Sequence, residues 1–393
     1  MLETVKQLAE QIFDEIVEIR RTIHRHPELG FCEYKTSDLI CSYLEKWGIP
    51  YKKGVAKTGV VGLIEVDPKA KTLLLRADMD ALPVQEETDC DFKSQIDGCM
   101  HACGHDVHVA ILLGVAAILM QMRDRLSCNV KLVFQPAEEG EGGAKPMIAE
   151  GVMENPHVDA AVGAHVINSV PAGKVLVKYG EVMASPDDFN MTIRGKGGHG
   201  AYPHECVDPI SIGVQILNAW NALSARYTTP LEKHLISVNM FQAGTCFNVI
   251  PDDAYISGTV RTFDETVRQY LAKRMGEIAE QIAAVFGAEC EFNFNYLYPP
   301  LLNDQAMTDA VRKSAEAILG KENVLEGVAP SMGGEDFAYF SKEVPATYIY
   351  YGSGNEKIGA VMPWHNAAFT IDEQCIKTGM IVMCQAALDF GEK

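Results

Sequence analysis

The spacing of apolar residues predicts two helices at the start of the chain. Between residues 2 and 25, apolar side chains recur every three or four positions, which places them on one face of an amphipathic helix. His26 and Pro27 end this pattern, because proline does not continue a helix. A second helix is expected over residues 35–47, before Gly48. The apolar positions of the first helix are Leu2, Val5, Leu8, Ile12, Ile16, Ile19 and Ile23.

Strands rich in valine and leucine then alternate with a helical stretch. We expect buried strands over residues 60–66, 72–76, 129–135 and 159–166, and a buried helix over the apolar run 109–120. Alternating strands and helices are typical of an α/β domain. Polar groups follow or interrupt these strands near their carboxyl ends, where open α/β sheets hold their sites. These groups are Asp78, Asp80, Glu138, Glu139 and His165.

The pattern changes after Gly180. Residues 185–297 are predicted to form strand, helix, strand, strand, helix and strand, which is the order of a ferredoxin-like α+β domain. Ser185-Pro186 and Pro299-Pro300 look like hinges at its boundaries. We therefore expect one domain of residues 1–184 and 298–393, interrupted by this insertion. The elements expected after Gly180 cover residues 189–194, 209–226, 235–241, 254–262, 265–286, 291–296, 305–319 and 346–351, with a closing helix from residue 372.

Composition and charge exclude several classes of partner. A length of 393 residues exceeds one ordinary core, in agreement with two domains. The formal net charge of −19 would repel phosphate backbones and anionic lipid, so we expect neither nucleic acid nor a membrane as partner. The apolar run 109–120 is too short to span a bilayer. With no signal-peptide pattern and 11 cysteines outside any disulfide framework, we expect reduced thiols and a cytoplasmic location.

Potential metal ligands are concentrated in residues 100–108, immediately before the buried helix. Thiolate and imidazole bind borderline-soft cations such as Zn²⁺ or Mn²⁺, and a carboxylate can coordinate or orient. At a helix N-terminus, the helix dipole would also lower the pKa of the Cys103 thiol. The alternative is a surface turn that enters a core helix, with Cys103 as a small apolar filler. The groups in this stretch are His101, Cys103, His105, Asp106 and His108.

Other candidate groups are ambiguous when taken one at a time. Glu138 and Glu139 could serve as base and ligand, because neighbouring side chains diverge, but two glutamates after a proline also suit a helix start. His165, in an apolar strand, is more often a hydrogen-bonded core residue than a ligand. His365 is equally open, and the glycines around His199 fit a hairpin turn as well as a site. The cluster at residues 100–108 favours a site at the glutamates.

Eight short motifs follow one another along the chain: Arg76-Ala77-Asp78-Met79-Asp80-Ala81-Leu82-Pro83, His101-Ala102-Cys103-Gly104-His105-Asp106, Gln135-Pro136-Ala137-Glu138-Glu139-Gly140, Gly163-Ala164-His165, Gly197-Gly198-His199, Asn248-Val249-Ile250-Pro251, Gly333-Gly334-Glu335-Asp336-Phe337 and Pro363-Trp364-His365-Asn366. Each motif is weak alone, but their common order is highly specific. In this order the chain resembles, over essentially its whole length, the metal-dependent aminoacylase/carboxypeptidase amidohydrolases. The similarity is closest to the branch of hippurate hydrolases, bacterial N-acyl-amino-acid deacetylases and plant auxin-conjugate hydrolases.

The resemblance implies a fold and a metal content. The catalytic domain would be zinc-peptidase-like α/β, with helices flanking a central mixed sheet, interrupted by a ferredoxin-like α+β lid or dimerisation domain. Two divalent metal ions per chain are implied, zinc first, with manganese, cobalt or nickel as alternatives. A water would lie between the ions. Their ligands would be Cys103, His105, Glu139, His165 and His365.

The resemblance also implies catalytic and substrate-binding roles. Glu138 would be the general base that takes the proton of the water. His199, reaching the site from the same or a partner subunit, would stabilise the tetrahedral oxyanion. Arg261 would hold the free carboxylate of the substrate, although a surface salt bridge is nearly as plausible for it. The substrate-binding residues would be Asn248, Arg261 and Gly334.

One position departs from the wider superfamily. Many relatives carry a ligand histidine where this chain has Asp78, two residues before Asp80. Metal binding is then expected to rest on Cys103 and His105, as in the closer branch. Asp80 keeps the place of the carboxylate that orients a ligand imidazole.

The leading prediction is hydrolysis of the amide bond of an N-acyl amino acid to a carboxylate and a free amino acid. A dipeptidase or carboxypeptidase would use the same centre, and a cysteine hydrolase would use Cys103 as nucleophile. A protein that only binds metal is a further alternative, but it would have no use for Glu138. We expect a small N-acyl amino acid or dipeptide as substrate. We also expect a homodimer or higher homo-oligomer, formed through an edge strand of the inserted sheet.

Overall fold

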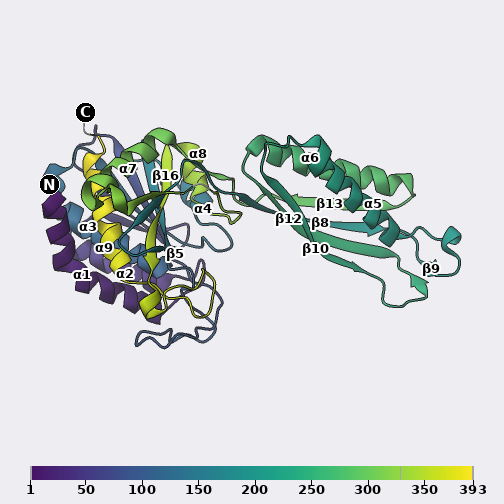
Figure 1. Cartoon of the computed structure of the whole chain (residues 1–393), viewed down its shortest axis with the longest axis horizontal. Coiled ribbons are helices and arrows are strands. Elements are labelled where there is room, and N and C mark those ends of the chain that lie inside the picture. Colours follow the sequence, from purple (N-terminus) through teal and green to yellow (C-terminus); the bar gives the residue numbers. More distant parts are fainter. Residues whose placement is uncertain (1, 328, 392–393) are drawn as a thin grey trace. The chain divides into compact units, whose positions relative to one another are not determined.

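The computed structural model describes residues 2–327 and 329–391, and their contacts divide the chain into two units. Unit 1 comprises residues 1–182, 302–329 and 339–393, and unit 2 comprises residues 183–301 and 330–338. Figure 1 labels the helices and strands of both units. Each unit has its own sheet and its own apolar core.

An eight-stranded mixed sheet forms the centre of unit 1. The strand β3 pairs in parallel with β4 and β5, and β5 pairs in parallel with β16, whereas β1, β2 and β4 pair in antiparallel fashion. The prediction of an α/β domain with a mixed sheet is confirmed. In spatial order the strands are β1 (Tyr51–Val55), β2 (Gly59–Ile64), β4 (Asn129–Gln135), β3 (Thr72–Asp78), β5 (Ala160–Pro171), β16 (Ala346–Gly354), β6 (Val175–Val177) and β15 (Val324–Glu326).

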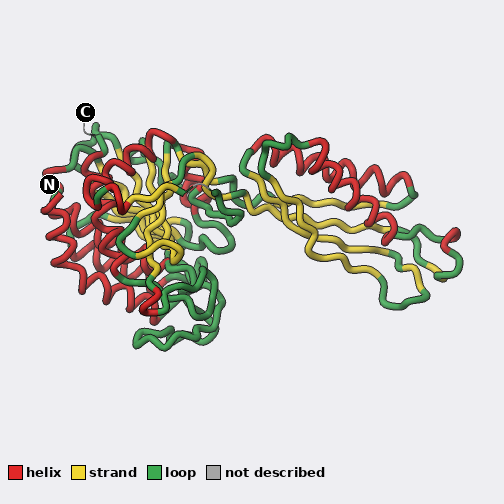
Figure 2. Tube along the Cα trace, viewed as in Figure 1, coloured by secondary structure: helices red, strands yellow, loops and turns green. Residues whose placement is uncertain are grey.

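Helices cover this sheet (Figure 2). The first predicted helix is confirmed, and the apolar run 109–120 lies inside a longer helix, α3, which packs against α1, α9 and strand β3. Residues 105–119 of α3 are all buried, and over residues 109–120 the helix is apolar on all sides. No helix among the described residues is both long and apolar enough to cross a membrane. The helices are α1 (Leu2–Arg25), α2 (Tyr34–Lys46), α3 (His105–Gln121), α4 (Ala144–Ala149), α7 (Gln305–Leu319), α8 (Ala338–Glu343) and α9 (Gln374–Asp389).

Unit 2 has the predicted order of strand, helix, strand, strand, helix and strand. Its four-stranded sheet is antiparallel, in the spatial order β10, β12, β8, β13. The helices α5 and α6 pack on the sheet around Trp220 and Phe189. The helix expected over residues 209–226 ends at Ala222, and a π-helical turn follows. The elements are β8 (Ser185–Arg194), α5 (Pro209–Ala222), β10 (His234–Ala243), β12 (Asp253–Thr262), α6 (Glu265–Val285) and β13 (Glu289–Asn295).

Several short strands have no counterpart in the predicted pattern. The edge strand β1 exposes four of its five residues, so it lacks the apolar alternation that reveals a strand. The strands β6 and β15 have three residues each and depend on pairing with distant segments. Two small pairs complete the fold: β9 (Gly198–His199) with β11 (Val249–Ile250), and β7 (Gly180–Met183) with β14 (Leu301–Asn303).

Candidate metal centre

The start of α3 brings two potential ligands together. Gly104 caps this helix in the left-handed conformation, with φ of +89°, so Cys103 lies before the helix and His105 is its first residue. A Cβ atom on Gly104 would lie 2.6 Å from Cγ2 of Val166 on β5. Glycine is therefore required here both for the backbone angle and for the close approach of helix to strand.

The five predicted ligands lie in one cluster within unit 1. The Cys103 Sγ atom is 3.3 Å from Nε2 of His165, and with His105 these residues offer ligand atoms within 4.8 Å of one another. Glu139 and His365 form a second such group with Cys103, and their Oε1 and Nε2 atoms are 3.3 Å apart. Residues from a helix start, a strand and two loops thus converge on Cys103.

A buried carboxylate holds two of these residues in place. The Asp80 Oδ1 atom lies 3.1 Å from Nδ1 of His105, and Oδ2 accepts a hydrogen bond of 3.0 Å from the backbone N–H of Glu139. His105 therefore turns Nε2 toward Glu139 Oε1, at 3.8 Å. Both of these atoms are buried; His105 Nε2 has no hydrogen-bond partner among the described residues, and Glu139 Oε1 has the 3.3 Å ion-pair contact with His365. An unpartnered imidazole nitrogen and a carboxylate beside a thiol and two further imidazoles fit a metal cation.

The expectation that Cys103 has a lowered pKa is wrong for the protein without a cation. Burial raises the pKa of this thiol well above its usual range, and the nearby carboxylates of Glu139 and Glu138 raise it further. These effects outweigh the helix dipole, and Cys103 also lies outside the first turn of α3. A cation beside the sulfur would instead lower the pKa of Cys103, because its positive charge stabilises the thiolate.

The imidazoles of the cluster differ in charge. Burial lowers the pKa of His105, but Asp78, Asp80 and Glu139 outweigh it and raise the pKa to about 10. Burial and the neighbouring His108 instead hold the pKa of His165 well below its usual range. Three carboxylates around His105 favour a positive charge at this point, which suits a divalent cation as well as a proton.

Glu138 and Glu139 follow a residue with left-handed backbone, Ala137, whose φ is +52°. The Ala137 N–H donates a 2.9 Å hydrogen bond to the buried Glu33. The expectation that the two glutamate side chains diverge is wrong, since each has an oxygen within 4.8 Å of a His105 nitrogen and of the other's carboxylate. They lie in a turn rather than in a strand, and a turn can direct neighbouring side chains to the same side.

Two residues of this cluster, noted in the sequence, were outside the ligand and catalytic sets that the resemblance implied. Asp78 and His108 are buried, with His108 Nδ1 at 2.5 Å from Asp78 Oδ1. Asp78 Oδ2 also lies 3.8 Å from His105 Nε2. The spacing of His105 and His108 could have revealed this, because residues three apart in a helix share a face. Their rings are stacked with centroids 5.4 Å apart.

The candidates His199 and Asn248 lie side by side in unit 2. His199 on β9 pairs with Val249 on β11, and Gly200 N donates to Asn248 O at 2.8 Å. Figure 1 labels β9 at one end of the sheet of unit 2. The exposed His199 accepts a 3.1 Å hydrogen bond from Ala201 N at Nδ1, so the neutral ring carries its proton on Nε2.

Arg261 and Gly334 lie at the opposite end of that sheet. Arg261 pairs with Pro186 near the end of β12, and a Cβ atom on Gly334 would lie 2.5 Å from Cγ of Pro186. The turn that carries His199 is hydrogen-bonded to Asp252, just before β12 begins. At about 3.4 Å per residue along β12, Arg261 and this turn are roughly 30 Å apart. The two pairs of candidates are therefore not neighbours within one chain.

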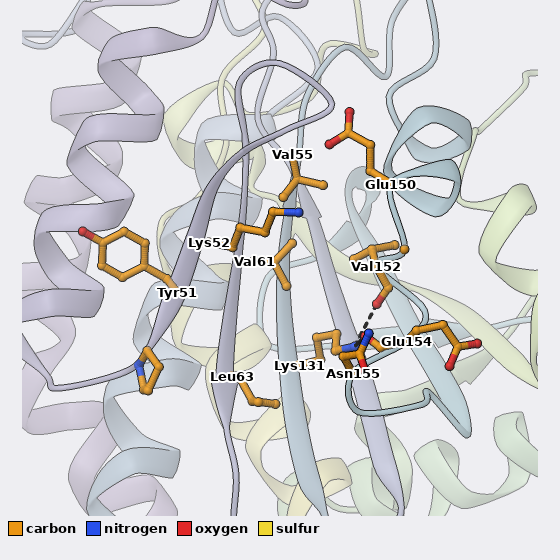
Figure 3. Close-up of a pocket in the computed structure, with 12 residues that line it drawn as sticks. Tyr51, Lys52, Val55, Val61, Leu63, Lys131, Glu150, Val152, Glu154 and Asn155 are labelled. Carbon is orange, nitrogen blue, oxygen red and sulfur yellow. Dashed lines mark hydrogen bonds between the residues drawn. The ribbon is translucent and has the colours of Figure 1, made fainter.

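A separate cavity of about 340 Å³ lies elsewhere in unit 1 (Figure 3). It is lined by residues of β1, β2 and β4 and of the loop after α4, including Tyr51, Lys131 and Glu150. The Lys131 ammonium donates to three backbone carbonyl oxygens of that loop. None of the candidate site residues lies among those described as lining this cavity, so it is distinct from the metal-ligand cluster.

The chain is similar to known proteins over its whole length. Thermostable carboxypeptidase 1 of Saccharolobus solfataricus is 44% identical over 397 residues, which cover 100% of both chains. N-acetylcysteine deacetylase of Bacillus subtilis is 39% identical, over 92% of this chain and 93% of that protein.

A solved structure has the same fold. The Bacillus subtilis YXEP protein, described as a dinuclear metal binding peptidase from the M20 family, aligns with a TM-score of 0.83 and 35% identity. The alignment covers 96% of this chain and 98% of that one. The model of peptidase family M20/M25/M40 matches residues 74–389. Because this match covers most of the chain and agrees with the predicted motifs, the protein belongs to peptidase family M20/M25/M40 and is a metal-dependent amidohydrolase.

Proposed function

We propose that the protein hydrolyses the amide bond of N-acyl amino acids, to give a carboxylate and a free amino acid. The observation that carries this proposal is the convergence of five ligand-type side chains beside Glu138, among them His105 with its buried Nε2 atom unpartnered within the described residues. The similarity to a deacetylase of acylated cysteine supports it. The ligands of two divalent cations would be Cys103, His105, Glu139, His165 and His365.

Thiolate and imidazole donors favour zinc, and manganese, cobalt or nickel would also suit this set. Two divalent cations, when bound, lower the pKa of water and polarise a carbonyl group. Asp80 keeps His105 and Glu139 oriented, because its two oxygens contact the His105 ring and the Glu139 amide. The dinuclear centre described for the YXEP protein supports two ions rather than one.

Glu138 acts as the general base in this proposal. Its carboxylate takes a proton from the attacking water and returns it to the amine that leaves. Glu138 is buried and has an oxygen within 4.8 Å of His105 and Glu139 ligand atoms, so it is close to the proposed ions. Limited exposure to bulk water keeps the transferred proton at the reacting atoms.

His199 supplies the donor for the oxyanion through Nε2–H, since Nδ1 accepts from the Ala201 amide. Asn248 beside it would bind the substrate, and Arg261 with Gly334 would bind the substrate's free carboxylate. An N-acyl amino acid is much shorter than the roughly 30 Å between the two groups. We therefore propose that a substrate meets His199 and Asn248 from one copy of the chain and Arg261 from another.

The end of unit 2 that carries His199 suits contact with a second copy. Phe247 is 100% exposed, and Tyr202 and Val249 are 53% and 52% exposed. The edge strand β10 also leaves one side of its backbone unpaired within the described sheet. Exposed apolar side chains and a free strand edge beside His199 support a homodimer.

Cleavage of peptides at the carboxyl end is the second candidate, and the 44% identical carboxypeptidase favours it. Peptide cleavage would use the same metal centre, and the rest of the peptide would lie where the acyl group of an N-acyl amino acid lies. A cysteine hydrolase is less well supported, because Cys103 has a raised pKa and would be a weak nucleophile. Eleven free thiols among the described residues favour a cytoplasmic location.

Removal and stepwise refilling of metal test this function. We expect the metal-free protein to be inactive, and about two ions per chain to restore release of amine from N-acetyl or N-benzoyl amino acids. The panel includes dipeptides, whose preferential cleavage would establish the second candidate instead. Glu138→Gln should keep its metal and lose about 10²–10⁴-fold in turnover. Activity that persists without metal, or in Glu138→Gln, would refute the proposal.

A further inference from the structure

The buried His108 has no role in the proposed reaction, yet its surroundings connect it to a ligand of the cluster. It lies one turn into α3, with its ring centroid 4.5 Å from that of His165. Its Nε2 atom accepts a 3.0 Å hydrogen bond from the backbone N–H of Val166. Because an amide N–H can only donate, Nε2 must be unprotonated and the ring proton must be on Nδ1.

The other side of His108 is held by a chain of buried charges. Its Nδ1–H donates to Asp78 Oδ1 at 2.5 Å, and Arg76 Nη1 donates to Asp78 Oδ2 at 2.5 Å. Arg76 is fixed in turn by a 2.9 Å hydrogen bond from Nε to Gln135. All four side chains are buried. Charge-assisted hydrogen bonds of this kind are short and directional, so the imidazole orientation is strongly determined.

Val166 transmits this orientation to His165. Its carbonyl oxygen accepts from His165 Nδ1 at 2.7 Å and from Trp364 Nε1 at 2.8 Å. A carbonyl can only accept, so Nδ1 of His165 is protonated and its Nε2 lone pair faces Cys103 Sγ at 3.3 Å. Trp364 packs against the His165 ring and precedes His365, a second proposed ligand.

The Val166 amide needs a partner of this type. The pairing of β3 with β5 ends at Gly163, three residues earlier, and His108 takes the place of a strand neighbour at Val166. A buried N–H group without a partner would destabilise the fold. The sequence places His108 here because α3 starts directly at His105 and the fourth residue of the helix faces β5.

We propose that His108 is a positioning residue of the metal centre, which acts through the Val166 peptide group to hold His165 with Nε2 directed at the metal. In this proposal Asp78 serves to fix His108, since its Oδ1 atom contacts His108 Nδ1 and its Oδ2 atom accepts from Arg76. The inference rests on the proposed function, since it assigns a task within that metal centre.

Two substitutions test the role in the full chain. His108→Leu removes both hydrogen bonds, whereas His108→Gln keeps an acceptor for the Val166 N–H. We expect His108→Leu to bind Zn²⁺ about 10–100-fold more weakly in titrations against a chelator, as for other residues that orient ligands. His108→Gln should recover most of this loss. The thiolate-to-cobalt band of the Co²⁺-loaded protein should change in His108→Leu, because His165 and Cys103 would bind in altered geometry.

A matched control separates positioning from general disturbance of the strand. Tyr351→Phe alters a buried side chain on β16 that lies in register with Val166. The Tyr351 hydroxyl has no hydrogen-bond partner among the described residues. Tyr351→Phe should leave both Zn²⁺ affinity and the cobalt spectrum unchanged. Thermal unfolding of each variant checks that it is folded. If His108→Leu fails to fold, Asp78→Asn replaces it, because that change weakens the contact that orients His108 and should also reduce Zn²⁺ affinity; wild-type affinity in folded Asp78→Asn would overturn the role.

The metal-free protein provides a readout that does not depend on activity. In ¹⁵N-histidine spectra, wild type should show His165 with its proton on Nδ1 alone, and His108→Leu should show a mixture of both tautomers. Wild-type zinc affinity, cobalt spectrum and tautomer in a folded His108→Leu would overturn the positioning role and leave the proposed function intact. If wild type binds no cation but the tautomer still responds to His108→Leu, the metal centre fails and the orienting contact stands.

Discussion

Imidazole–carboxylate pairs recur among the buried residues of unit 1. His105 is paired with Asp80, and His24 lies between two carboxylates, with Nδ1 2.8 Å from Asp106 and Nε2 3.2 Å from Glu86. Burial and the nearby Arg20 lower the pKa of His24, but the carboxylates of Asp106 and Glu86 outweigh them and raise it, which favours a protonated ring. Buried charges are tolerated only when they are paired. Removal of one partner should therefore leave the other as an unpaired buried charge, which lowers the free energy of unfolding.

Glu86 provides a test of this pairing through pH. Burial alone would raise the pKa of its carboxyl, but hydrogen bonds from His24, Thr88 and the Ser94 N–H outweigh burial and hold the pKa at about 2. A folded pKa below the unfolded value stabilises the protein above about pH 4.5, and this contribution is lost as the pH falls toward 2. We expect Glu86→Gln to lower the free energy of unfolding by about 3 kcal/mol at pH 7.

Urea denaturation from pH 7 down to pH 3 measures this effect. The difference between Glu86→Gln and wild type should shrink steadily below about pH 4.5. The control is Glu154→Gln, since Glu154 is an exposed carboxylate paired only with His157 at the surface among its described side-chain contacts. That variant should change the free energy of unfolding by less than about 0.5 kcal/mol. A difference for Glu86→Gln that is constant with pH would contradict the assigned pKa.

At the scale of elements, the contact between the start of α3 and β5 decides the geometry of the metal centre. Gly104 faces Val166, and Val166 in turn binds His108 and His165. One glycine therefore sets the distance between the helix that carries His105 and the strand that carries His165. A displacement of either element would move ligands on both.

Gly104→Ala should disturb this contact. The new Cβ would meet Val166 at 2.6 Å, and the φ of +89° is unfavourable for alanine. We expect a loss of about 1–3 kcal/mol in stability and a weaker affinity for Zn²⁺, measured by thermal unfolding and by metal titration. Gly48→Ala is the control, since Gly48 has a φ of +68° but open space around it. Gly48→Ala should reduce stability modestly and leave zinc affinity unchanged. Equal zinc affinity in the two variants would show that the contact between Gly104 and Val166 does not control the metal centre.

At the scale of the whole molecule, the roughly 30 Å between the turn that carries His199 and Arg261 within unit 2 decides how a complete site can form. A single small substrate cannot span that distance. If both residues act on it, the site combines two copies of the chain. Catalysis would then depend on assembly, and dilution below the dimer dissociation constant should reduce activity per chain.

Mixing two inactive variants tests this directly. Glu138→Gln lacks the base and His199→Ala lacks the oxyanion donor, so each should be inactive alone. After the subunits exchange at equal concentration, about half of the dimers should be mixed, and each mixed dimer would have one complete site. We expect the mixture to recover about a quarter of wild-type activity, because half of the dimers are mixed and each of these has one of its two sites complete. A mixture that stays inactive despite subunit exchange, shown by mass spectrometry of labelled chains, would place His199 in the site of its own chain.

Local patterns were sufficient for most long elements. The periodicity of apolar residues predicted the first helix at residues 2–25, and the strand at 129–135 and the helix at 305–319 also have their predicted bounds. In these segments the side chains that pack in the core lie close together in sequence, so the pattern is visible there. Edge strands such as β1, and three-residue strands such as β15, exist through pairing with distant residues and left no such pattern.

The sequence by itself determined the types of chemical group at the site, and their motifs identified the family. Only the tertiary structure decided how those groups affect each other: that burial raises the pKa of Cys103 in the absence of a cation, that Glu138 and Glu139 converge, and that His108 reaches Val166. These properties depend on burial and on distances between residues that are remote in the chain. Electrostatic and hydrogen-bond energies follow distance in space, and a linear sequence does not contain those distances.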